Sequence, residues 1–173
     1  IVPGVCTAEI TESRNGRTTV QPIEVLGRSV YSCAPEKGEN AIFKLAEKVK
    51  EMDLKKNKLL DLLFMVSERF GDMYGGSVGL RSESEYYGGE FVHRNVLSPT
   101  LFKVEDRCAR INVNIRSAYG AKEEETVGAM KALALSYGGE VVKVTILPAV
   151  YVSKDRPFVR AMAEAYEEAT GLK

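Results

Sequence analysis

Apolar and polar residues alternate in two stretches near the start of the chain, and this pattern predicts two β-strands. The first expected strand covers Val5 to Ile10, and the second covers Thr18 to Leu26. The dipeptide Asn15-Gly16 between them is a strong signal for a tight turn, so the two strands should form a hairpin. Pro22 has no backbone N–H group, which predicts that the second strand lies at a sheet edge or carries a bulge there.

Four other segments have the pattern of amphipathic or buried helices. The first runs from Asn40 to about Met52, and the second, Leu59 to Phe70, is apolar over most of its circumference. The third, Glu123 to Tyr137, begins with acidic residues that complement the positive end of a helix dipole. The last begins near Pro157, a residue that suits a first helical turn, and runs to about Thr170.

Three segments in the second half of the chain predict further strands. They are Phe91 to Ser98, Arg107 to Arg116 and the valine-rich Glu140 to Leu147, with a turn at Glu105-Asp106. Polar residues alternate with apolar ones in the second of these segments, which predicts one polar and one core face. The apolar set expected on the core face is Cys108, Ile111, Val113 and Ile115.

The order of these elements predicts an α+β fold, in which helices pack on one face of an antiparallel sheet. The ferredoxin-like split arrangement of strands and helices is the natural candidate. A chain of 173 residues with 45% hydrophobic residues can bury one core, so we expect one domain. Two apposed halves, residues 1–90 and 91–173, are the alternative arrangement.

Composition narrows the range of partners. The chain has 24 basic and 24 acidic side chains, so its charge gives no reason to expect nucleic acid or an anionic membrane as partner. No apolar run approaches the roughly 20 residues that span a bilayer. The three widely spaced cysteines suggest neither a disulfide framework nor a metal knuckle. We therefore expect reduced thiols, including Cys33, in a cytoplasmic protein.

Residues 27–41 read GRSVYSCAPEKGENA. This stretch resembles G-x-[AS]-x-H-[AGS]-x-x-P-x-x-G-x-N-A, a pattern of the lid, or dimerisation, domain of the dinuclear-zinc peptidases and amidohydrolases. That superfamily includes the Xaa-His dipeptidases, carboxypeptidase G and acetylornithine deacetylase. Three further stretches resemble the Xaa-His dipeptidase branch: the opening Ile1-Val2-Pro3, the strand of residues 111–116, INVNIR, and the segment from Pro148 to Lys173.

The resemblance implies roles for individual residues. Arg116 matches the arginine that binds the substrate's C-terminal carboxylate, and a planar guanidinium can grip a carboxylate with two parallel hydrogen bonds. Tyr31 takes the position of the histidine that stabilises the tetrahedral oxyanion, and its phenol can donate one neutral hydrogen bond there. Asn95 matches a motif asparagine and is, with Arg116, a candidate substrate-binding residue, although we expect it to fix the backbone more than the substrate.

The chain lacks the residues of a metal site. A dinuclear zinc site needs about five protein ligands including histidine, whereas His93 is the one histidine and is expected to be structural or exposed. The run Glu123-Glu124-Glu125 is expected to form a solvated helix start. The resemblance thus implies a lid domain without its catalytic zinc domain, and we expect this chain alone to hold no zinc and to hydrolyse no dipeptide.

Three functions stay open at this point. The first is the lid of a zinc-dependent dipeptidase, which closes over the active site and binds the substrate carboxylate. The partners of such a lid would be the zinc catalytic domain of the same polypeptide, the dipeptide and, as an alternative, a second copy of the chain. The second is a non-catalytic dimerisation or interaction module of a degenerate homologue, which the Tyr31 departure favours. The third is the dimerisation domain of an N-acyl amino-acid deacylase.

Overall fold

A computed structural model of the chain describes residues 1–15, 17–80, 86–87, 90–91, 93–147 and 150–172. The first hairpin pairs β1 (Val5–Arg14) with β2 (Arg17–Leu26) in antiparallel register, from Val5 opposite Leu26 to Arg14 opposite Arg17. The predicted hairpin is confirmed, and Asn15 has the positive φ of 52° that a tight turn requires. Gly16 lies outside the described residues.

The second hairpin pairs β5 (Val96–Glu105) with β6 (Cys108–Arg116). Its two-residue turn is Asp106-Arg107, and both residues have positive φ. This turn lies one residue later than the sequence pattern indicated. A register shift between Pro99 and Leu101 marks a bulge in β5, which accommodates the proline within the strand. A short pair, β3 (Tyr86–Tyr87) with β4 (Glu90–Phe91), completes the described strands.

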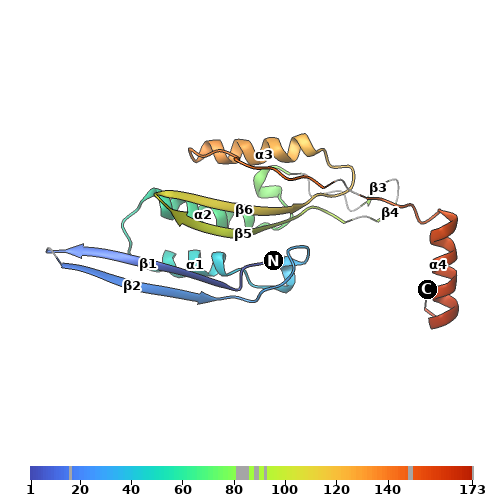
Figure 1. Cartoon of the computed structure of the whole chain (residues 1–173), viewed down its shortest axis with the longest axis horizontal. Coiled ribbons are helices and arrows are strands. Elements are labelled where there is room, and N and C mark those ends of the chain that lie inside the picture. The colour runs from blue at the N-terminus through green and yellow to red at the C-terminus, as the bar shows by residue number, and fades with distance from the viewer. Residues whose placement is uncertain (16, 81–85, 88–89, 92, 148–149, 173) are drawn as a thin grey trace.

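The helices are α1 (Ala41–Lys50), α2 (Lys58–Phe70), α3 (Glu123–Ser136) and α4 (Pro157–Thr170). Two single turns of 3-10 helix, η1 (Pro35–Lys37) and η2 (Gly76–Val78), lie in the loops. All four predicted helices are confirmed to within a few residues at their ends. In Figure 1, α3 runs along the second hairpin, and α4 stands apart from the rest of the chain.

The core lies where α1 and α2 meet the two hairpins. Helix α1 contacts β1, β2, α2 and β5, and α2 contacts β5 and η2. The most deeply buried large side chains of this core include Ile42, Val66 and Leu97, each at most 1% exposed. The α+β class is therefore confirmed, with helices packed against antiparallel strands. The described strands form three two-stranded sheets.

Three expectations about strands are wrong. Residues 91–98 are not one strand, because β4 ends at Phe91 and β5 begins at Val96. Residues 140–147 form no strand, although they are rich in β-branched residues, because strand formation depends on a paired neighbour. Cys108 is exposed rather than on the core face. The half-buried positions of β6 are odd-numbered, so Cys108 is out of phase with Ile111, Val113 and Ile115.

Asn40 connects the first helix to the second hairpin. Its Oδ1 accepts a hydrogen bond from the backbone N–H of Ile42 at 3.0 Å, which caps α1. Its Nδ2 donates to the carbonyl oxygen of Pro99 in β5 at 2.9 Å. Asn57 caps α2 in a similar way through Leu59 and Leu60, but its Nδ2 reaches only Lys55 nearby in the chain.

We predict that Asn40→Ala lowers the free energy of unfolding by about 2 kcal/mol, because it removes both a helix cap and a partly buried link to β5. Asn57→Ala removes an exposed cap alone and should cost about 1 kcal/mol. Urea unfolding of both variants checks this. Equal losses would show that the link to Pro99 contributes nothing.

Candidate functional site

The loop that carries Tyr31 is held at both ends by backbone hydrogen bonds. Arg28 and Glu39 exchange two such bonds, of 2.9 and 3.0 Å, and Val2 N donates to the carbonyl of Val30 at 2.8 Å. Within the loop, Ala34 N donates to the carbonyl of Tyr31 at 3.0 Å. The backbone at Tyr31 is therefore fixed, while its side chain is 78% exposed. The phenol projects into solvent and does not pack on a sheet.

Gly27 and Gly38 allow the two sides of this loop to lie close together, because neither has a side chain. A Cβ atom at Gly27 would collide with the carbonyl oxygen of Glu39, and one at Gly38 would collide with Val30 and the carbonyl of Arg28. After the loop, Ala41 is completely buried and its N–H donates to the carbonyl of Pro3 at 2.9 Å. These residues position the loop and supply no reactive group.

Arg116 is the last residue of β6 and lies opposite Val96. Its side chain is exposed, as the alternating pattern predicts, while Ile115 and Val113 are half-buried. Among the described residues, no hydrogen bond or ion pair holds the Arg116 guanidinium. It is therefore available to an anion from outside this part of the chain.

Asn95 fixes the chain directly after Arg116. It is 4% exposed, and its Oδ1 accepts a hydrogen bond from Ala118 N at 2.8 Å. Ala118 is also buried, at 3% exposed. A buried backbone donor needs such a partner, so Asn95 determines the path of residues 117–118. The structure thus gives Asn95 a backbone contact in a buried position, and its substrate-binding role stays a prediction.

The candidate residues lie toward one end of the hairpins. In Figure 1, the turns of both hairpins lie on the left. The loop before α1 lies at the other end of the hairpins, on the same side as the start of β5 and the end of β6. The 3-10 turn η1, which lies within the Tyr31 loop, contacts β5. Arg116 and Asn95 are joined through the β5–β6 pairing and Ala118. The structure therefore joins Arg116 and Asn95 through their own elements, and it connects Tyr31 to them only through the contact of η1 with β5.

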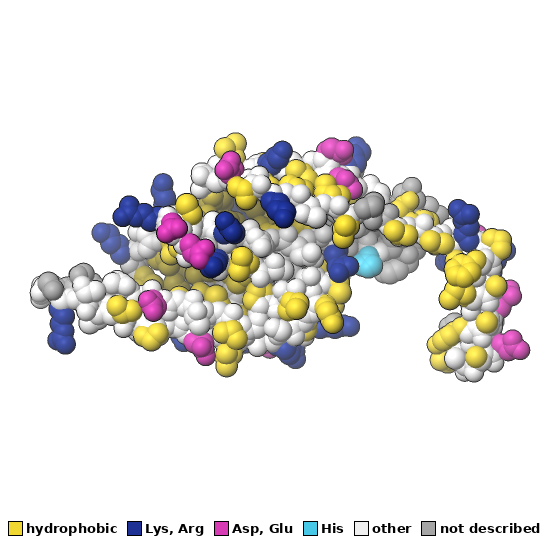
Figure 2. Space-filling model, viewed as in Figure 1, with side chains coloured by type: hydrophobic (Ala, Val, Ile, Leu, Met, Phe, Trp, Pro, Cys, Tyr) yellow, Lys and Arg dark blue, Asp and Glu magenta, His cyan; other side chains and the backbone are white. Residues whose placement is uncertain are grey.

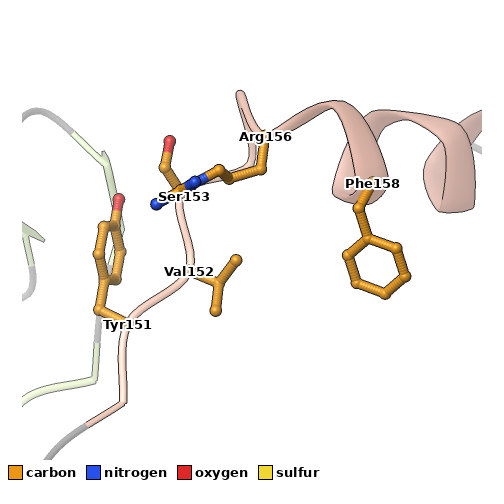
Figure 3. A pocket seen from close by; sticks show the side chains of 5 residues that line it. All are labelled: Tyr151, Val152, Ser153, Arg156 and Phe158. Atoms are coloured by element: carbon orange, nitrogen blue, oxygen red, sulfur yellow. The ribbon is translucent and has the colours of Figure 1, made fainter.

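A hollow of about 540 Å³ lies beyond this region and does not include the candidate residues. It is lined by Tyr151, Val152, Ser153, Arg156 and Phe158, and Figure 3 shows Arg156 reaching back toward Ser153 while Phe158 lies at the start of α4. The Tyr151 ring packs against Tyr119, with centroids 4.8 Å apart. The side chains that line the hollow come from residues 151–158, and none of Tyr31, Asn95 and Arg116 is among them.

The described residues do not fit a zinc site. They contain no group of three or more histidine, cysteine, aspartate or glutamate side chains placed to hold a metal ion. His93 is exposed, as expected, and appears at the surface in Figure 2. The side chains of Glu123, Glu124 and Glu125 are exposed at the start of α3. Among the described residues, no helix is long and apolar enough to cross a membrane.

Sequence reasoning did not anticipate the contact between Arg94 and Tyr74. The Arg94 guanidinium carbon lies 3.3 Å from the centre of the Tyr74 ring, a cation–π arrangement that holds Arg94 beside the start of β5. Tyr74 lies between α2 and η2 and Arg94 lies between β4 and β5, so no local sequence pattern predicts this contact. Asn112 and Asn114 match no motif residue, but the alternation that exposes Arg116 exposes them too.

Comparisons with known proteins point to peptidases. No family model matches the chain. The chain is 22% identical over 149 residues to a protein of Staphylococcus epidermidis (strain ATCC 12228 / FDA PCI 1200) named "Putative dipeptidase". It is 23% identical over 148 residues to similarly named proteins of Staphylococcus aureus strains USA300 and NCTC 8325.

Each of these alignments covers 86% of this chain but only 31% of the relative. The chain therefore spans less than a third of the length of these relatives. This coverage is consistent with one domain of a larger dipeptidase.

The three cysteines are free thiols in different environments. Cys33 and Cys108 are exposed, whereas Cys6 in β1 is partly buried. Burial raises the pKa of the Cys6 thiol, an effect that a hydrogen bond from the backbone of Thr7 partly offsets. At a given pH, Cys6 therefore holds less of the reactive thiolate than an ordinary cysteine.

We predict that iodoacetamide near pH 8 labels Cys33 and Cys108 before Cys6, and that raising the pH speeds Cys6 labelling. Unfolded protein should take up label at all three positions without prior reduction. Peptide mass measurement over time checks both statements. Resistance of any cysteine to labelling in the unfolded, unreduced chain would indicate a disulfide.

Proposed function

We propose that this chain is the lid domain of a dipeptidase, and that it binds the C-terminal carboxylate of the substrate through Arg116. The observation that carries the proposal is the exposed guanidinium at the end of β6, within a strand that resembles the family's arginine strand. The peptidase names of the relatives support the same class. Zinc as the metal of the parent enzyme, and a cytoplasmic location, are parts of this proposal.

The reaction in the parent would add water across one amide bond. The water oxygen attacks the carbonyl carbon, the C–N bond breaks, and the leaving amine takes a proton. No residue described in this chain activates that water. The contribution of this chain is to hold the substrate and to stabilise the negative charge that forms in the transition state. Both effects lower the activation free energy of such reactions considerably.

Tyr31 is the second residue in this proposal. Its phenol O–H can donate a hydrogen bond to the oxyanion that forms when water adds to the carbonyl. The fixed backbone on both sides of Tyr31 and the exposed ring would allow the hydroxyl to point out of this domain toward a partner domain. Such a donor acts without becoming charged, unlike a histidine cation.

A non-catalytic interaction module is the second candidate function. Helix α4 favours it, because Phe158, Met162 and Tyr166 are each more than half exposed on that helix. An amphipathic helix of this length gains little stability alone and normally buries its apolar face. The dimerisation domain of a deacylase is not favoured by an observation of its own.

We predict that Arg116→Ala in the larger protein costs about 2–5 kcal/mol of transition-state stabilisation, as for one partner of a desolvated charge pair. Arg116→Lys should recover only part of the loss, because an ammonium cannot form the bidentate fork. Folding should be nearly unchanged, because the side chain is exposed. Kinetics on dipeptides and on dipeptide amides check this.

The amide substrates are the internal control. They lack the carboxylate, so wild type and Arg116→Ala should hydrolyse them equally poorly. A proportional loss on acid and amide substrates, or unfolding of the variant, would make Arg116 structural and would refute its assigned role.

For Tyr31, we predict that Tyr31→Phe lowers kcat on the order of 10²-fold with little change in KM, as loss of one oxyanion donor does. Tyr31→His, which introduces the family's residue, should retain activity. Thermal unfolding should stay unchanged in both, because the side chain is exposed. An unaltered kcat in Tyr31→Phe would remove Tyr31 from the site.

A further inference from the structure

The polar face of β6 presents a row of side chains that nothing in the described structure uses. Asn112, Asn114 and Arg116 are all exposed, and they alternate with half-buried residues that face the core. The backbone carbonyl of Asn112 accepts a hydrogen bond from Thr100, but no described residue bonds to the side-chain amide of Asn112 or Asn114. Within the described part of the chain, the row therefore offers two side-chain amides and one guanidinium without a partner.

One end of this face is already neutralised. Lys103 forms an ion pair with Glu105 at 2.6 Å, and the pKa of the Glu105 carboxyl is lowered first by Lys103 and, more weakly, by Arg110. Arg110 therefore lies close to a carboxylate of its own chain. Arg116, at the other end, has no such neighbour among the described residues, so an incoming carboxylate is favoured at the Arg116 end.

The spacing of the row matches that of an extended peptide. Side chains on one face of a strand repeat about every 6.8 Å, which is two residues of about 3.4 Å each. An extended peptide beside the row has the same repeat. With its carboxylate on Arg116, a dipeptide would reach about as far as Asn114, and a longer peptide would reach toward Asn112.

We propose that Asn114 and Asn112 extend the Arg116 site into a strip that binds the backbone of a short extended peptide. Each asparagine amide donates its N–H to a peptide carbonyl or accepts an N–H of the peptide at Oδ1. Asn114 contacts both dipeptides and longer peptides, whereas Asn112 contacts only peptides of three or more residues. The strip rests on the proposed function for the role of Arg116, and it adds that the site takes tripeptides as well as dipeptides.

The opposite strand limits the strip on one side. Val96 and Ser98, which pair with Arg116 and Asn114, are buried at 7% and 1% exposed. A peptide therefore cannot spread over β5 at this end and must follow β6. The strip contacts only the backbone of the peptide and not its side chains. It should therefore bind peptides with different side chains.

The test uses this chain with isotopically labelled asparagine side chains and follows them by NMR during titration with dialanine, trialanine and trialanine amide. Dialanine should shift the Asn114 amide signals and leave Asn112 unchanged, and trialanine should shift both. Trialanine amide should bind at least tenfold more weakly than trialanine, because it lacks the carboxylate that Arg116 holds.

Variants separate the two asparagines. Asn114→Ala should weaken both peptides by about three- to tenfold, the effect of one lost hydrogen-bonding side chain. Asn112→Ala should weaken trialanine alone by a similar factor. Asn114→Ser provides a second variant with a small polar side chain, and Gln21→Ala, at an exposed amide in β2, is the matched control that should bind like wild type.

Equal binding of trialanine and its amide would overturn the proposal, as would wild-type affinity in both Asn114 variants. These outcomes differ from a failure of the proposed function. If trialanine binds with the expected variant pattern but the larger protein hydrolyses no peptide, the dipeptidase proposal is refuted and the peptide-binding strip is supported. If hydrolysis depends on Arg116 but not on Asn114 or Asn112, the dipeptidase proposal is supported and the peptide-binding strip is refuted.

Discussion

The hydrogen bonds of the Asn40 side chain hold the two halves of this structure in register. The side chain begins α1 by accepting from Ile42 N, and it ties α1 to β5 by donating to the carbonyl of Pro99. Pro99 lies 59 residues further along the chain and directly before the bulge in β5. A bulge leaves backbone groups without a ladder partner, so this carbonyl is free to accept from a side chain. One amide group therefore adds a directional link to the apolar packing of α1 and α2 against β5, which also positions the second hairpin.

The geometry of the candidate site follows from this connection. Because β5 is held against α1, its pairing with β6 determines where β6 ends, and Arg116 is its last residue. Asn95 then turns the chain through its bond to Ala118 N, which keeps residues 117–118 close to the start of β5. The guanidinium is thus carried on a paired strand with a fixed exit rather than on a free loop. Binding groups on such supported backbone lose less entropy when a ligand arrives.

Local patterns predicted most elements, and long-range contacts explain what they missed. The hairpins, the cap of α1 and the exposure of Arg116 depend on turn residues, capping chemistry and alternation within a few residues. The bond from Asn95 to Ala118 spans 23 residues, and the Arg94–Tyr74 contact joins two connecting segments that are far apart in the sequence, so no local pattern predicts either contact. Residues 140–147 were expected to be a strand on composition alone, but a strand also requires a neighbour with free hydrogen-bonding groups. Their exposed valines and the apolar face of α4 remain unpaired within the described residues.

The loop of residues 27–41 contains residues that the fold requires and one residue, Tyr31, that the fold does not require. Gly27 and Gly38 permit close backbone approach, Asn40 caps and connects, and the buried Ala41 leaves no space for a larger side chain. Each of these residue types follows from packing or hydrogen bonding that the structure shows. Tyr31 does not, because its ring is largely exposed and a histidine would fit there equally well. An exchange between tyrosine and histidine at this position would therefore change charge and hydrogen-bonding chemistry rather than packing, because the loop backbone is held by its own hydrogen bonds and the side chain is exposed.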